Sequence, residues 1–182
     1  MTKTYDYVTL VNFVQPENIE NITGAVYREY DKDDIHGPAE GVTKDAKVLR
    51  CKWGYVQPFL HQFNDYLIDI NSKCFGYSLY PMSALTAVNL TEYVDGGQYD
   101  WHIDGDPSKI SDCKLTAILN ISDHEYTGGN FELFLNGPTH IKELDKPGGM
   151  VVFKSHISHR VLPVLTGQRR TLSIFLMGPK FV

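Results

Sequence analysis

The feature that most constrains the fold is a change of sequence pattern near Ser78. Beyond it the chain is a series of short runs rich in β-branched and aromatic residues, separated by Gly, Pro and Asp. We expect these runs to form strands: Ala84–Tyr93, Tyr99–Asp104, Leu115–Ile121, Asn130–Leu135, Gly149–Phe153, His159–Leu165 and Arg170–Met177. Such a succession of short strands predicts a β-sandwich or barrel.

The first 78 residues contain helical patterns instead. Pro16, followed by an acidic residue, suits the first turn of a helix that we expect to run to about Glu29. An apolar stripe at helical spacing predicts a second helix packed on a sheet: Phe59, Phe63, Tyr66, Leu67 and Ile70. The segment Tyr5–Val14 predicts a strand, and the charged segment Asp31–Pro38 predicts a surface loop.

Length and composition are those of one globular domain. The chain has 182 residues, of which 42% are apolar and 21% charged, close to the averages for such proteins. We therefore predict a single α+β domain over residues 1–182, with helical support over about 1–78 and a strand core over about 79–182. The net charge of −5 argues against a nucleic-acid partner, because such binders usually carry a basic surface.

The sequence predicts a cytoplasmic protein without a membrane anchor. The segment Met1–Asp6 lacks the apolar core of a signal peptide. No apolar run approaches the roughly 18 residues that a membrane span needs. The three cysteines, Cys51, Cys74 and Cys113, are odd in number and widely spaced. They suit neither a disulfide framework nor a zinc site, and a reducing compartment accounts for them most simply.

The segment Tyr99–Asp104 contains a His-x-Asp triplet. In a strand His102 and Asp104 project from the same face, while Ile103 packs behind them. An imidazole and a carboxylate side by side can occupy two neighbouring positions on a divalent metal. One further histidine would complete the two-histidine, one-carboxylate triad that leaves metal positions open. A single triplet of this kind often arises by chance, so it predicts a metal site only together with further ligands elsewhere in the chain.

Further along the chain are two histidines that could bind the metal and an arginine that could bind a carboxylate. His156 and His159 could each supply the third ligand. Ten residues after His159, Arg169 begins a strand in which Thr171 and Ser173 share its face. A guanidinium flanked by hydroxyls suits a carboxylate, because its planar fork binds both oxygens at once.

Taken together, these motifs resemble a known family. The order Tyr-x5-Tyr-x2-His-x-Asp, a Gly-Gly turn, and Phe-x5-His-x-Val-x-Pro-Val-x2-Gly-x-Arg spans Asn89 to Phe175. It resembles the prolyl 4-hydroxylase-like group of Fe(II)- and 2-oxoglutarate-dependent dioxygenases, and most of all the small bacterial and phage PKHD-type hydroxylases. The resemblance implies a double-stranded β-helix, or jelly-roll, with Fe(II) inside one end. It also implies 2-oxoglutarate and O2 as cosubstrates, with ascorbate as an auxiliary reductant.

The resemblance assigns metal ligands to three residues of this chain. His102 and Asp104 match the first two ligands. His159 matches the third, because the family places its arginine about ten residues after that histidine and Arg169 stands there. His156 is the competing residue, three positions earlier and on the opposite strand parity.

The resemblance also implies contacts to 2-oxoglutarate. Arg169 would anchor the far carboxylate, assisted by Ser173 or Thr171. Tyr93 and Tyr99 match two family tyrosines, of which Tyr93 would donate a hydrogen bond to the cosubstrate. One departure concerns the strand after His-x-Asp. Where other members have a tyrosine, this chain has Leu119 or Asn120, which puts the finer contacts in question.

The implied reaction is hydroxylation of a prolyl residue in a peptide or protein. Aromatic residues near the motif, including Trp101, could pack against the pyrrolidine ring, and Asp31–Pro38 with Trp53–Tyr55 could form a lid. The acidic balance would favour neutral or basic segments. Two alternatives stay open: a hydroxylase of free amino acids, and a cupin-like zinc or manganese protein. The second has no need for an arginine ten residues after the last ligand.

Overall fold

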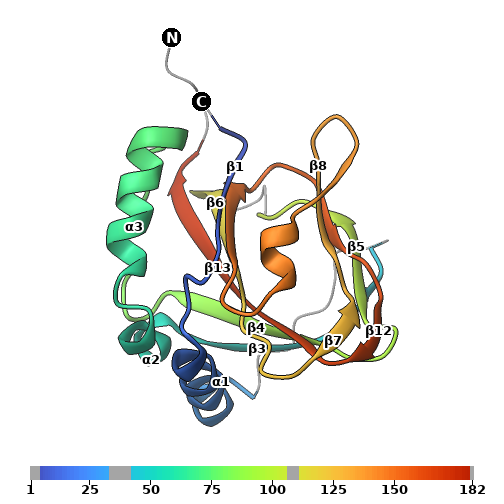
Figure 1. Cartoon of the computed structure of the whole chain (residues 1–182). Coiled ribbons are helices and arrows are strands. Elements are labelled where there is room, and N and C mark those ends of the chain that lie inside the picture. The colour runs from blue at the N-terminus through green and yellow to red at the C-terminus, as the bar shows by residue number, and fades with distance from the viewer. Residues whose placement is uncertain (1–4, 33–41, 106–110, 181–182) are drawn as a thin grey trace.

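The computed structural model describes residues 5–32, 42–105 and 111–180. Within them two antiparallel sheets face each other (Figure 1). The larger sheet has the order β1 (Tyr7–Leu10), β10 (Met150–Lys154), β6 (Ser111–Asn120), β13 (Arg169–Pro179), β4 (Ala87–Tyr93) and β3 (Lys47–Lys52). The smaller sheet has the order β2 (Lys44–Asp45), β5 (Gln98–His102), β11 (His159–Val161), β8 (Phe131–Phe134) and β9 (Pro138–His140). A separate pair joins β12 (Val164–Gly167) to β7 (Tyr126–Gly128).

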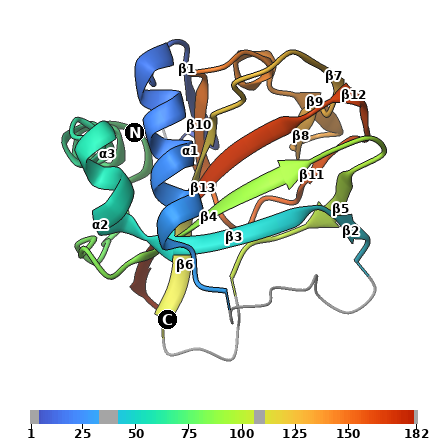
Figure 2. The same cartoon turned by 90° about the horizontal axis from the view of Figure 1, so that it is seen from below.

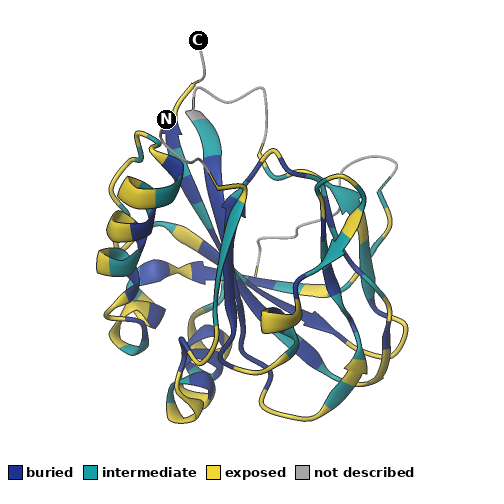
Figure 3. Cartoon of the chain, turned by 45° about the horizontal axis from the view of Figure 1, so that its top comes forward, coloured by how far each residue is buried: buried dark blue, intermediate teal, exposed yellow. Residues whose placement is uncertain are grey.

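The helices pack on the side of the larger sheet that faces away from the smaller one (Figure 2). They are α1 (Pro16–Glu29), α2 (Trp53–Val56) and α3 (Phe63–Ile70), with the short turns η1 (Gln57–Phe59) and η2 (Asn71–Phe75). A further short turn, η3 (Lys142–Asp145), lies on the other side of the larger sheet, where Leu144 packs in the core between the sheets. Their inner faces are buried and their outer faces exposed (Figure 3). The predicted α+β class is confirmed. The predicted loop Asp31–Pro38 lies mostly outside the described residues.

The first predicted helix has the predicted bounds, and the second is shorter than its apolar stripe suggests. Pro16 occupies the first turn of α1, and the chain leaves the helix at Tyr30. Phe59 belongs to η1 and not to α3, because the backbone departs from helical angles at Leu60. Trp53–Tyr55 was expected to form part of a lid. This is wrong for Trp53, whose side chain is buried in the core beneath the helices.

Three strand predictions need correction. The predicted strand Tyr99–Asp104 is β5, which ends at His102, and Ile103 is 59% exposed instead of packed behind the pair. The predicted strand His159–Leu165 is in fact β11 and β12, which pair with different partners. Pro163 lies between them, and a proline has no N–H to donate to a strand ladder. The predicted strand Tyr5–Val14 is only Tyr7–Leu10, since Asn12 adopts a φ of 55° that ends the extended conformation. The short or charged strands β2, β3, β7 and β9 were not predicted.

Alternation along β13 separates the helical core from the space between the sheets. Leu172, Ile174 and Leu176 are buried in the cluster that includes the helices. Arg169 and Thr171 lie on the opposite face, as the period of two residues predicts. The larger sheet is therefore hydrophobic toward the helices and carries polar groups toward the smaller sheet.

A buried charge network joins α1 to β4 and β13 of the larger sheet. The Glu92 side chain is only 5% exposed and accepts a hydrogen bond from Arg170 Nε at 2.9 Å. The hydroxyl of Tyr27 and the amide of Gln168 also donate to it. Burial alone would raise the pKa of Glu92, but the hydrogen bonds from Tyr27 and Arg170 hold it below its ordinary value. The network therefore stabilises the fold only while Glu92 is ionised.

No helix among the described residues is both long enough and apolar enough to cross a membrane.

We predict that Glu92→Gln lowers the free energy of unfolding by about 2 kcal/mol near neutral pH, because Arg170 loses its buried partner. A carboxylate with a depressed pKa contributes stability above its unfolded-state pKa of about 4.3, and loses it as pH falls through the folded-state pKa. The difference in the free energy of unfolding between Glu92→Gln and wild type should therefore shrink on acidification. Urea unfolding between about pH 7 and about pH 3 measures it. The exposed Glu20→Gln is the control, and a difference independent of pH would contradict the account.

Candidate metal centre and adjoining pocket

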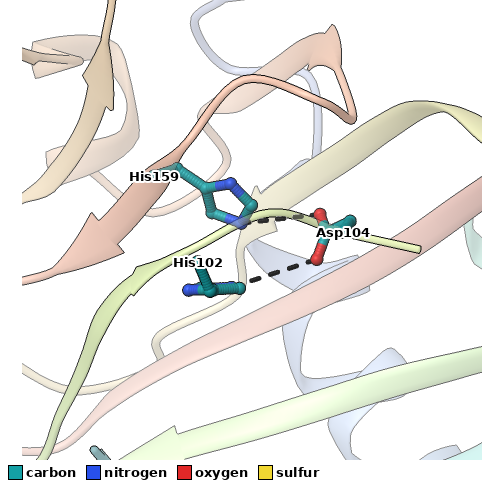
Figure 4. Close-up of side chains that lie close together, drawn as sticks. All are labelled: His102, Asp104 and His159. Carbon is teal, nitrogen blue, oxygen red and sulfur yellow. Dashed lines mark ion pairs between the residues drawn. The ribbon is translucent and has the colours of Figure 1, made fainter. Parts of the chain in front are cut away.

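The pairing of β5 with β11 brings the two predicted histidines together. His102 ends β5, His159 begins β11, and the two are direct partners in the antiparallel register. Asp104 follows two residues after His102. Its Oδ1 lies 3.9 Å from His102 Nε2, and its Oδ2 lies 3.5 Å from His159 Nε2. The three side chains converge on one point (Figure 4). Each offers one potential ligand atom, and these three atoms lie within 4.8 Å of one another.

Backbone hydrogen bonds fix which nitrogen each imidazole presents. His102 Nδ1 lies 2.8 Å from the carbonyl oxygen of Asp100, and His159 Nδ1 lies 3.0 Å from that of Ile157. A carbonyl oxygen only accepts, so Nδ1 carries the proton in both rings. The unprotonated Nε2 atoms then point toward Asp104, which is the tautomer a metal ligand needs.

The Asp104 carboxylate is oriented from the larger sheet. Thr116 on β6 donates a hydrogen bond from Oγ1 to Asp104 Oδ2 at 2.7 Å. The Thr116 hydroxyl lies 3.0 Å from the Ser155 hydroxyl, whose own backbone carbonyl accepts the Asp104 N–H. Thr116 therefore holds the carboxylate, and Ser155 holds the Asp104 backbone. Sequence reasoning missed both residues, and only the alternation of β6 could have indicated that Thr116 faces inward.

Burial favours the neutral form of all three groups, which is the form in which the two histidines can bind a metal. Burial lowers the pKa of His102 to about 4, and the neighbouring His159 contributes to the shift. Burial likewise lowers the pKa of His159 to about 4, so both rings are neutral near pH 7. Burial raises the pKa of Asp104, although the Thr116 hydrogen bond opposes the shift. A divalent cation would stabilise the Asp104 anion, and two neutral imidazoles with one carboxylate fit Fe(II) with positions to spare.

Aromatic rings hold both imidazoles in place. Tyr99 stacks on His102, with ring centroids 3.5 Å apart and planes inclined by 13°. The rings of Phe153 and His159 pack edge to face, with their centroids 4.8 Å apart. His156, by contrast, is exposed and lies outside the cluster. The geometry therefore favours His159 as the third ligand.

A pocket of about 160 Å³ runs from the cluster to Arg169 between the two sheets. The Arg169 side chain is buried, with 1% of the residue exposed, yet none of its three guanidinium nitrogens is hydrogen-bonded to a group in the described part of the chain. Its guanidinium lies 5.6 Å from the centre of the Tyr93 ring. A buried cation without a hydrogen-bonding partner is costly, so this group is suited to an anionic ligand.

The Gly-Gly turn noted in the sequence forms part of the wall behind Arg169. Gly129 has a φ of +63°, and a Cβ there would lie 2.8 Å from Arg169 Cδ and 2.9 Å from Val164 Cγ2. Glycine therefore allows β13 and the turn to approach closely enough to confine the arginine.

The other predicted cosubstrate residues line the same pocket. Tyr93, Tyr99, Thr171 and Ser173 all contribute to it. Burial raises the pKa of Tyr93 while the Arg169 charge opposes the shift, which leaves the hydroxyl a donor near neutral pH.

Leu119 and Asn120, which stand where other family members have a tyrosine, both point away from the pocket. Leu119 packs into the helical core. The amide of buried Asn120 donates to the Tyr126 hydroxyl and to the Leu144 carbonyl, so it is already engaged outside the pocket lining.

A larger hollow of about 1530 Å³ lies elsewhere, between the start of α1 and the β7 region. Its lining includes Glu20, Asp123, Glu125 and Asp145, and none of its residues belongs to the triad or the smaller pocket. We assign the chemistry to the smaller pocket, because that is where the candidate ligands and the unpartnered guanidinium meet.

Two histidines and a carboxylate inside paired antiparallel sheets are the donor set of non-haem Fe(II) oxygenases. Comparison with known proteins agrees with this class. A model of the 2OG-Fe(II) oxygenase superfamily matches residues 88–177. The chain therefore belongs to the 2OG-Fe(II) oxygenase superfamily, which implies Fe(II) and 2-oxoglutarate (2OG). A sequence search of curated proteins gives no match.

Solved structures share the fold at low identity. A prolyl-4-hydroxylase of Pseudomonas putida matches with a TM-score of 0.73 and 18% identity, over 97% of this chain and 95% of that one. The viral collagen prolyl hydroxylase of Paramecium Bursaria Chlorella virus-1 matches with 0.67 and 15%, over 96% and 97%. A Trichoplax adhaerens prolyl hydroxylase, in complex with a peptide fragment of hypoxia inducible factor, matches with 0.66 and 16%, over 94% and 83%. The predicted jelly-roll core is thereby confirmed.

We predict that His102→Ala, Asp104→Ala and His159→Ala each weaken Fe(II) binding by more than about 100-fold, beyond the 10–100-fold typical of residues that only support a ligand. His156→Ala should bind as wild type, because its side chain lies outside the cluster. Anaerobic calorimetric titration with Fe(II) measures the affinities, and circular dichroism checks the fold. Loss of binding in His156→Ala with retention in His159→Ala would reverse the assignment.

Proposed function

We propose that this protein is an Fe(II)- and 2-oxoglutarate-dependent dioxygenase that hydroxylates a prolyl residue in a peptide or protein, releasing succinate and CO2. The observation that carries the proposal is the buried guanidinium of Arg169, which shares a pocket with the His102–Asp104–His159 cluster and has no hydrogen-bonding partner among the described residues. A set of three metal ligands alone would suit many reactions. The added demand for an anion at the far end of the pocket is what points to a dicarboxylate cosubstrate.

The proposed roles divide along the pocket. Fe(II) held by the triad would supply the redox chemistry that couples decarboxylation of 2-oxoglutarate to insertion of one oxygen atom into a C–H bond. The planar fork of Arg169 would bind both oxygens of the far carboxylate, with Thr171 and Ser173 beside it on β13. The hydroxyl of Tyr93 would donate a further hydrogen bond. No side chain has to act as a general acid or base.

Two observations support a peptide substrate. The pocket of about 160 Å³ is smaller than the roughly 300–1,000 Å³ of most small-molecule sites. With the cosubstrate inside, it would admit one side chain from a longer chain more readily than a whole separate ligand. The fold is also shared with prolyl hydroxylases, one of them solved with a peptide. Of the aromatic residues once expected to pack against proline, Trp101 contacts Phe134 and Arg160 instead of lining the pocket.

Arg169 also separates this proposal from a cupin-like zinc or manganese protein, which has no need for a buried carboxylate anchor. A hydroxylase of free amino acids would share the whole site, so only the substrate distinguishes it. Ascorbate would serve as an auxiliary reductant of the metal, without a dedicated site in this proposal.

We predict that Arg169→Lys raises the KM for 2-oxoglutarate at least about tenfold, because a lysine keeps the charge and loses the two-pronged hydrogen bond. Arg169→Ala should nearly abolish use of 2-oxoglutarate. Succinate formation at varied 2-oxoglutarate measures both effects. The neighbouring Arg170→Ala is the control: its side chain lies on the opposite face of β13, so it should lose stability and keep the wild-type KM. An unchanged KM in Arg169→Ala would remove the main support for the proposal.

For the substrate, we expect a mass gain of one oxygen on proline when proline-containing peptides are incubated with the protein, Fe(II), ascorbate and 2-oxoglutarate. Tandem mass spectrometry locates the modified residue. The gain should be absent in His102→Ala, which would lack a metal ligand. Efficient turnover of free proline or of a nucleoside, with every peptide unmodified, would contradict the prolyl assignment and favour a small-molecule or nucleic-acid substrate.

A further inference from the structure

A second cation lies in the pocket, on the side of the smaller sheet. Lys44 is on the edge strand β2, paired with Tyr99, and it lines the same pocket as the triad. Its Nζ lies 4.5 Å above the centre of the Tyr99 ring, and that ring stacks on His102. Within the described part of the chain, this ammonium makes no hydrogen bond or ion pair. Lys44 therefore presents a positive charge beside the candidate metal rather than beside Arg169.

Arg50 adds a third cation from the larger sheet. Its Nε donates to Asn89 Oδ1 at 3.1 Å, and both residues line the pocket. Asn89 pairs across the sheet with Ser173, four residues along β13 from the Tyr93–Arg169 pair. The Lys44 and Arg50 charges are close enough to interact. Burial lowers the pKa of Lys44, Arg50 lowers it further, and the Asp104 carboxylate opposes both.

The charges proposed for the occupied pocket leave Lys44 unbalanced. A divalent metal would be balanced by the two carboxylates of 2-oxoglutarate. Among the protein groups, Asp104 balances Arg169. In the described part of the lining, the remaining charged side chains are those of Lys44 and Arg50, and both are positive. A partly buried cation is stabilised by a hydrogen-bonded anion, and no component of the proposed reaction other than the substrate can supply one.

We propose that Lys44, flanked by Arg50, binds a carboxylate of the substrate next to the carbon that is hydroxylated. The preferred substrate is then an acidic one: a proline beside an Asp or Glu residue, or a proline whose own carboxylate is free. The site reverses the preference expected from the net charge of −5, because the charge lining the pocket is positive. The hydroxylation itself rests on the proposed function, whereas recognition of the carboxylate can be tested without turnover.

The test is equilibrium binding with Zn(II) in place of Fe(II) and 2-oxoglutarate present, so that no reaction occurs. One fluorescent peptide pair carries Glu or Gln on either side of proline, with both ends blocked. A second pair ends in proline with a free or an amidated carboxylate. Wild type should bind the charged member of at least one pair about tenfold more tightly, as a charge-assisted hydrogen bond implies. The pair that responds identifies the source of the carboxylate.

The preference should vanish in Lys44→Met and return in Lys44→Arg. The control Lys142→Met, at an exposed lysine outside the pocket, should keep it. The absence of any charge preference in wild type, or its survival in Lys44→Met, overturns the proposal. So does a raised requirement for 2-oxoglutarate in Lys44→Met, which would assign the lysine to the cosubstrate. Charge-selective binding without any hydroxylation would contradict the proposed function and leave the Lys44 assignment standing.

Discussion

The site depends on one strand pairing. The antiparallel register between β5 and β11 sets His159 directly opposite His102, and the chain needs only two more residues to reach Asp104. A shift of that register by one residue would turn His159 to the other face of the sheet and dissolve the cluster. The pairing is secured by its surroundings, since β8 continues the ladder beyond β11 and Phe131 and Phe153 pack against the His159 ring.

The larger sheet supplies what the smaller one lacks. Thr116 orients the carboxylate, and Arg169 closes the far end of the pocket. Because β13 alternates strictly, the same strand anchors the helices through Leu172 and Ile174 while it presents Arg169 to the interior. The Arg169 position is therefore fixed by hydrophobic packing on the opposite face. The helices serve the chemistry indirectly, by holding this sheet rigid behind the pocket.

The sequence was informative where the chemistry follows strand parity. The grouping of Arg169 with Thr171 follows from a period of two residues and needs no tertiary information. The same rule brought His102 and Asp104 together in the prediction, but β5 ends at His102, and the Asp104 backbone is held by the Ser155 carbonyl. The choice of His159 over His156 needed spacing from a known family, because both lie near the same strand end. Thr116 and Lys44 could not be foreseen. Thr116 is one inward hydroxyl among many, and Lys44 lies in a strand of two residues whose partner is more than 50 positions away. Loop closure over such distances leaves no local pattern.

The central claim is that one pocket joins a metal triad to a carboxylate anchor. The most direct test is a crystal structure of the protein grown with Mn(II), which substitutes for Fe(II), and 2-oxoglutarate under anaerobic conditions. Anomalous scattering locates the metal independently of the surrounding density. The account predicts a single manganese peak coordinated by His102, Asp104 and His159, with the far carboxylate of 2-oxoglutarate hydrogen-bonded to Arg169. A manganese peak elsewhere, or a far carboxylate bound by Lys44 and Arg50 while Arg169 stays without a ligand, would contradict it.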